Sequence, residues 1–96
     1  MIARTLRLRI AGRVQGVGYR DFVRSEAESR ALTGWVRNRR DGTVEAMVRG
    51  AAESVDELIA ACWRGTPASR VTDVQVETTP EDAELPTTGF TVRPTA

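Results

Sequence analysis

The amino-acid sequence predicts an α+β fold in which two helices pack on one face of a four- to five-stranded antiparallel sheet. Three observations predict it. Segments with alternating apolar and polar residues indicate strands, two segments have helical spacing, and together they follow the order β-α-β-β-α-β. The chain has 96 residues, which fits a single domain over residues 1–96.

Alternation marks the strands. In the first, from Thr5 to Arg13, three apolar side chains share one face: Leu6, Leu8 and Ile10. Further strands are predicted at residues 34–38, 43–49 and 70–78, and residues 89–93 fit a short fifth strand. An Asp-Gly pair at 41–42 predicts a hairpin between the second and third strands. The segment from Thr79 to Thr88 has two prolines and three acidic residues, so it is predicted to be a loop.

Helical spacing marks two further segments. The first helix is predicted over residues 21–31, where four apolar side chains are suitably placed: Phe22, Val23, Ala27 and Ala31. The second has apolar residues at i, i+3, i+4 and i+7: Val55, Leu58, Ile59 and Cys62. Ser54 and Glu57 have the spacing of a capping box, so this helix is expected to begin at Ser54. The element order is that of the ferredoxin-like βαββαβ sandwich, which hosts many unrelated functions.

The composition excludes several kinds of site. The sequence has no histidine and one cysteine, which excludes a histidine-activated nucleophile, an internal disulfide and the usual transition-metal ligand sets. All 14 basic residues are arginines, so no lysine is present for a Walker motif or a Schiff base. No metal or other cofactor is expected. Cys62 lies on the apolar face of the second predicted helix and is assigned to the core.

Charge and hydropathy limit the partners. The formal net charge is +1, well below the basic surplus of a typical nucleic-acid-binding protein. The outward positions of the first and third strands hold no aromatic residue for base stacking: Arg7, Arg9, Glu45, Met47 and Arg49. No apolar run approaches the roughly 20 residues that span a bilayer, and no signal peptide is evident. We therefore expect a cytoplasmic protein without a nucleic-acid or membrane partner. A monomer is also expected, although no sequence feature points to the oligomeric state.

The loop from Arg13 to Arg20 is the first candidate site. It connects a strand to a helix and contains Gly16 and Gly18, which allow backbone N–H groups to converge near the positive end of the helix. Arg20 offers a planar guanidinium for bidentate phosphate contact. From these residues alone, a plain glycine-rich connection with a solvated surface arginine is equally consistent.

Asn38 is the second candidate. It follows a strand just before the predicted hairpin turn, and its amide carries both a donor and an acceptor. One atom can hold a water while the other contacts a substrate oxygen. Asparagine is also common where strands reverse, and taken alone this second interpretation is favoured.

Together the two segments resemble the signatures of the acylphosphatase family. The first is Ile-Ala-Gly-Arg-Val-Gln-Gly-Val-Gly-Tyr-Arg at 10–20, and the second is Gly-Trp-Val-Arg-Asn at 34–38, followed by Gly42, Val44 and Gly50. Residues 64–71 are also similar to the family's link between the second helix and the fourth strand. The resemblance runs from about Leu6 to Phe90. It implies a ferredoxin-like hydrolase that cleaves the carboxyl-phosphate bond of acyl phosphates to give a carboxylate and inorganic phosphate.

The resemblance also implies residue roles. The backbone of six loop residues is expected to cradle the substrate phosphate: Gln15, Gly16, Val17, Gly18, Tyr19 and Arg20. Arg20 is expected to bind the phosphate, and Asn38 to position the attacking water. Trp35, Gly42 and Gly50 are assigned structural roles, in the core, in a turn and at a chain reversal.

Two departures from the family pattern stand out. Tyr19 occupies a position that usually holds phenylalanine, so its hydroxyl needs a partner or water. Arg30 and Ala31 replace the Leu-Gly pair that commonly ends the first helix. Because the left-handed conformation of such a glycine costs alanine about 1–2 kcal/mol, the end of this helix is expected to be arranged differently.

The motifs also constrain the proton transfer. Asn38 cannot take a proton at neutral pH, and neither motif contains a histidine, cysteine or lysine. Our hypothesis is that a phosphate oxygen of the substrate accepts the proton of the water. The alternative function is a catalytically silent acyl or carbamoyl phosphate-binding domain, like the acylphosphatase-like domains that begin hydrogenase maturation proteins. An RNA-binding role is less favoured because the strands lack the stacking aromatics.

Overall fold

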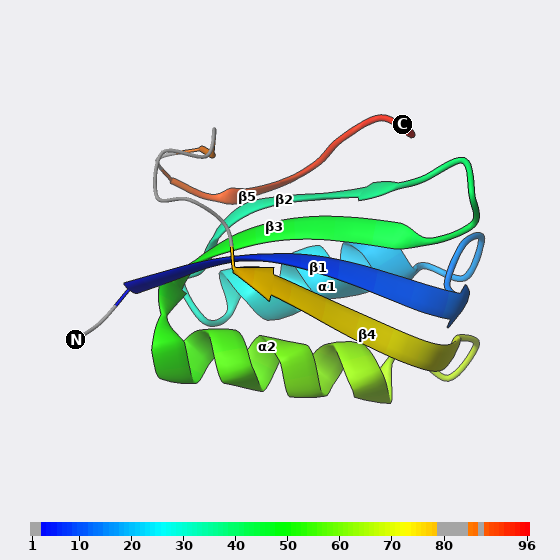
Figure 1. The fold of residues 1–96 in the computed structure, drawn as a ribbon, viewed down its shortest axis with the longest axis horizontal. Coiled ribbons are helices and arrows are strands. Elements are labelled where there is room, and N and C mark those ends of the chain that lie inside the picture. Colours follow the sequence, from blue (N-terminus) through cyan, green and yellow to red (C-terminus); the bar gives the residue numbers. More distant parts are fainter. Residues whose placement is uncertain (1–2, 79–84, 87) are drawn as a thin grey trace.

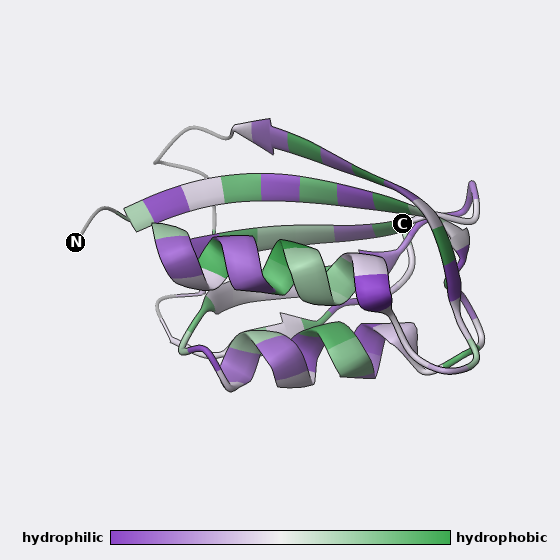
Figure 2. Cartoon of the chain, turned by 90° about the horizontal axis from the view of Figure 1, so that it is seen from below, coloured by the Kyte–Doolittle hydropathy of each residue, from purple (hydrophilic) through white to green (hydrophobic). Residues whose placement is uncertain are grey.

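The fold was analysed in a computed structural model, which describes residues 3–78, 85–86 and 88–96. The elements are β1 (Ala3–Arg13), α1 (Tyr19–Glu28), β2 (Thr33–Asn38), β3 (Val44–Ala51), α2 (Ala52–Arg64), β4 (Arg70–Thr78) and β5 (Phe90–Val92). Both helices lie on the same face of the sheet (Figures 1 and 2). The predicted fold class is therefore confirmed. The predicted loop from Thr79 to Thr88 falls mostly outside the described residues. In the part of the chain that is described, neither helix has the length and apolarity to cross a membrane.

The sheet has the strand order β4-β1-β3-β2-β5. The first four strands pair antiparallel, as predicted, whereas β5 joins β2 in parallel, so the complete sheet is mixed. Alternation sets the register of the pairing. Ile10 on β1 pairs with Val44 on β3 and Val74 on β4, and all three are buried, so the apolar positions of three neighbouring strands share one face. That face is the one that the helices cover (Figure 2).

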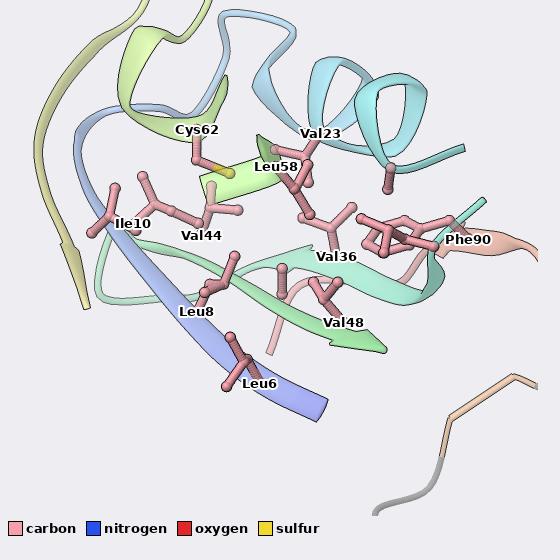
Figure 3. Packing of buried hydrophobic residues seen from close by; sticks show 14 of the residues in the cluster. Leu6, Leu8, Ile10, Val23, Val36, Val44, Val48, Leu58, Cys62 and Phe90 are labelled. Atoms are coloured by element: carbon pink, nitrogen blue, oxygen red, sulfur yellow. The ribbon is translucent and has the colours of Figure 1, made fainter. Parts of the chain in front are cut away.

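The core lies between this face and the helices (Figure 3). Its side chains come from the alternating positions of β1 and β3 and from the apolar stripes of α1 and α2: Leu6, Leu8, Ile10, Val44, Ala46, Val48, Val23, Ala27, Val55, Leu58 and Cys62. Cys62 is fully buried, which confirms its assignment to the core. Burial raises the pKa of its thiol to about 11, so it remains protonated at neutral pH.

The predicted start of α2 was wrong. The helix begins at Ala52, its N-cap is Ala51, and no side chain caps it, so Ser54 and Glu57 do not form a capping box. The physical reason is that β3 runs directly into the helix, with Ala51 as both the last strand residue and the cap. The first helix is also shifted, because it covers residues 19–28 instead of 21–31.

The end of α1 also differs from the expectation. Ala31 has a φ of 57°, in the left-handed region, so it adopts the conformation that a glycine would take there. The amide of Leu32 donates to the carbonyl of Ala27 (3.0 Å), and the amide of Ala31 donates to that of Glu28 (3.1 Å). These are the two bonds of a Schellman motif. Leu32 is 2% exposed, and its burial offsets the conformational cost at Ala31.

Trp35 lies outside the main core. It is only 5% exposed, but the core cluster includes its neighbour Val36 and not Trp35 itself, because successive strand residues point to opposite faces. The guanidinium groups of Arg37 and Arg93 lie 4.6 and 4.8 Å from the centre of its ring. The indole is therefore buried under two arginines on the outer face of the sheet, where cation–π contact replaces apolar packing.

Glu45 is a second buried residue on the outer face. Its side chain is 3% exposed, and its carboxylate accepts hydrogen bonds from Arg7 Nε (2.6 Å), Arg37 Nε (2.8 Å) and Arg39 Nη1 (3.2 Å). Burial alone would raise the pKa of Glu45. The hydrogen bonds and charges of Arg37 and Arg7 outweigh it and hold the pKa below its ordinary value.

Candidate active site

The loop between β1 and α1 has the backbone conformation of an anion-binding nest. Gly16 and Gly18 have φ angles of 72° and 74°, while Val17 between them keeps a negative φ. Such alternation turns successive N–H groups toward one point. Gly18 is also the N-cap of α1, and a helix begins with unpaired N–H groups and a partial positive charge. Among the described residues, no turn or cap hydrogen bond is donated by an amide of residues 15–20.

A hollow of about 140 Å³ lies at this loop, a volume suited to a small anion rather than to a drug-sized ligand. It is lined by Val14, Gly16, Gly18, Tyr19, Arg20, Asp21 and Val92. The carboxylate of Asp21 lies 3.6 Å from Arg24 Nη2, one helical turn further on. Within the described chain the guanidinium of Arg20 has no ion pair or hydrogen bond, so it remains available to a ligand.

Two of the six predicted cradle residues do not line the hollow. The side-chain amide of Gln15 extends away from the loop, and its Nε2 donates to the backbone carbonyls of Arg39 (2.8 Å) and Thr43 (2.9 Å). Val17 packs against the core, and its carbonyl accepts from the Thr66 hydroxyl (3.4 Å). Gly16, Gly18, Tyr19 and Arg20 are therefore the predicted residues that the fold brings to the hollow.

Tyr19 anchors the start of α1. Its side chain is 1% exposed, and its hydroxyl donates to the carbonyl of Cys62 at 2.7 Å. The partner expected for this hydroxyl is thus a carbonyl in the last turn of α2, where backbone acceptors lack helical partners. Burial and the contact with Cys62 raise the pKa of Tyr19 far above its ordinary value. The phenol stays neutral and cannot serve as a base near neutral pH.

Asn38 is the last residue of β2, at the same end of the sheet as the loop (Figure 1). Its backbone is held by pairing with Val44 and by a hydrogen bond from the Ala96 amide to its carbonyl (3.0 Å). Its Oδ1 is buried without a hydrogen-bond partner, and no other side-chain atom of the described residues is in that position. An unpaired buried acceptor costs about 1–3 kcal/mol, so this oxygen favours a donor such as water.

Asn38 does not itself line the hollow of the loop. The two candidates are linked through Gln15, which reaches the hairpin residues that follow Asn38. Sequence reasoning missed this link, and it also missed Val14, Asp21 and Val92 as lining residues. In the sequence, only the position of Gln15 beside the glycines pointed to this link. The partners of Gln15 lie more than twenty residues away in the chain, so no local pattern relates them to it.

A sequence model of the acylphosphatase family matches residues 6–92. The chain belongs to the acylphosphatase family. A curated relative from Acidiphilium cryptum (strain JF-5), named acylphosphatase, is 54% identical over 95 residues, which cover 99% of each chain. The crystal structure of acylphosphatase from Bacillus subtilis superimposes with a TM-score of 0.86 at 36% identity, covering 96% of this chain and 99% of that one. An acylphosphatase from Coxiella burnetii gives a TM-score of 0.84 at 36% identity, covering 95% and 93%.

Membership of the acylphosphatase family confirms two predictions. The chain is an enzyme of this family, whose substrates are acyl phosphates and whose product is phosphate. The resemblance noted at residues 10–20 and 34–38 was also correct, since both motifs lie inside the matched range. The departures at Tyr19 and Ala31 occur within an otherwise typical acylphosphatase fold.

Proposed function

We propose that this chain hydrolyses acyl phosphates by binding the phosphate to the amides of residues 15–20 and to Arg20, while Asn38 positions the attacking water. No metal ion takes part in this proposal. The observation that carries it is the hollow at the nest. Two glycines with positive φ, the first residues of α1 and Arg20 all line this small volume, and the Arg20 guanidinium has no partner among the described residues. These three sources of positive potential suit a phosphate.

The proposed reaction is a direct displacement on phosphorus. The water oxygen attacks the phosphorus atom, the bond from phosphorus to the acyl oxygen breaks, and the carboxylate leaves with the electron pair. A phosphate oxygen takes up the proton of the water, so the products are a carboxylate and inorganic phosphate. Phosphoryl transfer depends mainly on positioning and on stabilising charge on the equatorial oxygens. The nest and Arg20 provide that stabilisation.

The role proposed for Asn38 rests on its buried oxygen. Oδ1 lacks a donor and is closed to solvent, so a water admitted by a small movement of its neighbours would donate to it and be held in a fixed orientation. The amide nitrogen remains available to donate to an oxygen of the substrate. Because an amide takes no proton at neutral pH and Tyr19 stays neutral, the proton passes to the substrate.

The test is the hydrolysis of benzoyl phosphate in excess chelator by the wild-type chain, Arg20→Ala and Asn38→Ala. Arg24→Ala is the matched control, because Arg24 lies one turn further along α1 and does not line the hollow. Each site variant is expected to lose about a hundredfold or more in kcat/KM, since one preorganised donor contributes about 2.7–4 kcal/mol to the barrier. The control and the chelator should leave activity within about twofold, as surface arginines contribute little.

Other outcomes would overturn the proposal in recognisable ways. Loss of activity in chelator would indicate a metal, and full activity of Arg20→Ala would remove the phosphate role. A folded wild type that binds phosphate without turnover would indicate a catalytically silent acyl or carbamoyl phosphate-binding domain. We further propose a monomer of 10.5 kDa that binds no nucleic acid, which sedimentation with and without added RNA would test. We also propose a cytoplasmic location, which fractionation of cells that express the protein would test.

A further inference from the structure

Gln15 holds the phosphate loop and the end of β2 in one arrangement. Its Nε2 has two N–H groups, and both are used: one on the carbonyl of Arg39 and one on that of Thr43, at 2.8 and 2.9 Å. Arg39 immediately follows Asn38, and Thr43 immediately precedes Val44, the residue that pairs with Asn38. The side chain therefore binds both strands of the hairpin at the point where Asn38 lies.

These two bonds connect the loop between β1 and α1 to the hairpin between β2 and β3, and each of these segments is otherwise held by its own contacts. The hairpin is closed by its own backbone bonds, from the Arg39 amide to Thr43 (2.8 Å) and from the Gly42 amide to Arg39 (3.1 Å). The carbonyl of Asn38 is fixed from the other side by the amide of Ala96. Among the described residues, the bonds from Gln15 are the only hydrogen bonds between residues 14–18 and the turn 39–43.

We propose that the Gln15 side chain is a positioning residue, which fixes the distance and orientation between the phosphate held by the loop and the water held by Asn38. The inference rests on the proposed function of those two groups. It assigns to Gln15 a task different from a direct phosphate contact, since its amide donors point to the hairpin and it does not line the hollow. The loop would still bind phosphate without this side chain, but the attacking water would no longer be aligned.

The geometry predicts a selective kinetic defect. Gln15→Met keeps the length of the side chain and removes both donors. It is expected to lower kcat on benzoyl phosphate by about tenfold to a hundredfold, the scale of a small misplacement of reacting groups, with KM and the inhibition constant of inorganic phosphate within about twofold. Gln75→Met is the matched control, because Gln75 is the other glutamine of the chain and lies exposed on β4.

A double-mutant cycle separates positioning from stability. If Gln15 acts through Asn38, Gln15→Met should cost almost nothing further in the Asn38→Ala background. Equal losses in both backgrounds would overturn the proposal, and so would a rise in the phosphate inhibition constant that matches the loss in kcat. The first outcome would indicate a general structural role, and the second a direct phosphate contact.

Hydrogen exchange tests the same link without catalysis. The amides of Arg39 and Gly42 bond to the two carbonyls that Gln15 contacts, so both should exchange at least about tenfold faster in Gln15→Met. The side-chain amide signals of Asn38 should shift as well, while the central amides of β2 and β3 remain unchanged. Unchanged exchange at Arg39 and Gly42 would overturn the proposal even in an inactive protein. If the wild type is inactive but exchange at these two amides is faster in Gln15→Met, the proposed function is contradicted and the link through Gln15 is supported.

Discussion

The hydroxyl of Tyr19 donates a hydrogen bond to the backbone carbonyl of Cys62, 2.7 Å away, and so joins the first residue of α1 to the last turn of α2. Both groups are buried, and the carbonyl belongs to the part of a helix that lacks internal donors. The loop between β1 and α1 enters the helix at Tyr19, so this bond fixes one end of the loop to the second helix.

Tyr19→Phe is expected to lower the free energy of unfolding by about 1–2 kcal/mol, because a buried carbonyl loses its donor while the ring still packs. Urea unfolding at pH 7 measures this. Activity on benzoyl phosphate should stay within about threefold, since the hydroxyl does not face the substrate. A variant as stable as the wild type would mean that water replaces the hydroxyl.

The same bond predicts sensitivity to alkali. The pKa of Tyr19 is raised in the folded state, so its contribution to stability is complete below the ordinary value of about 10 and is lost as the pH rises above it. The stability difference between the wild type and Tyr19→Phe should therefore shrink between pH 9 and pH 11. Tyr19 is the single tyrosine of the chain, so tyrosinate absorbance reports this group directly. A difference that stays constant over this range would contradict the assignment.

Ala31→Gly is expected to stabilise the chain by about 1 kcal/mol, because glycine accepts the φ of 57° that alanine adopts with strain. The matched control is Ala60→Gly, in the exposed interior of α2, which should destabilise by a similar amount. Thermal or urea unfolding of both variants measures the pair. Destabilisation by both substitutions would show that Ala31 carries no strain.

Glu45→Gln is expected to cost about 2 kcal/mol at pH 7, because three arginines lose a buried charged acceptor. The folded-state pKa of Glu45 is lowered, so its stabilising contribution is present above the ordinary value of about 4.5 and disappears as the pH falls below it. Urea unfolding from pH 7 to pH 3 should show the free energies of unfolding of the wild type and Glu45→Gln converging. Glu77→Gln removes an exposed partner of Arg7 at 3.6 Å and should change stability by less than about 0.5 kcal/mol.

The rate of hydrolysis should show no steep dependence on pH between about 5 and 8, since Tyr19 stays neutral there and the sequence has no histidine. An essential base titrating in this window would change kcat by about tenfold per pH unit on its limb. The measurement is kcat for the hydrolysis of benzoyl phosphate in buffers whose pH ranges overlap. A sharp bell-shaped profile would contradict proton transfer to the substrate.

Local periodicity was enough to predict most of the fold. The alternation of Leu6, Leu8 and Ile10 and the helical spacing of Val55, Leu58 and Cys62 both reflect burial on one face, and burial dominates folding. The errors arose where a tertiary contact outweighed a local preference. Ala31 adopts the left-handed conformation because the burial of Leu32 requires it. The capping pattern at Ser54 is unused because β3 continues into α2.

Positions in the candidate site were predictable to different degrees. The nest was foreseeable, because Gly16 and Gly18 precede a helix and only glycine adopts positive φ cheaply. The environments of Gln15 and Trp35 were not. Gln15 binds carbonyls of Arg39 and Thr43, and Trp35 is covered by two arginines on the outer face, both of which depend on strands meeting in three dimensions. Sequence patterns identify the groups at a site more readily than the side chains that orient them.

The position of β1 in the sheet has a consequence for synthesis of the chain. β1 is translated before the other four strands but lies between β3 and β4, so its second neighbour is complete only after residue 78. Pairing over such a sequence distance forms late and slowly. The loop that follows β1 is held at Val17 by Thr66 and at Tyr19 by Cys62. A nascent chain that ends before residue 60 therefore carries every residue of the loop between β1 and α1 without the contacts that shape it. If the loop binds phosphate as we propose, that affinity arises only when the remainder of the chain has folded onto it.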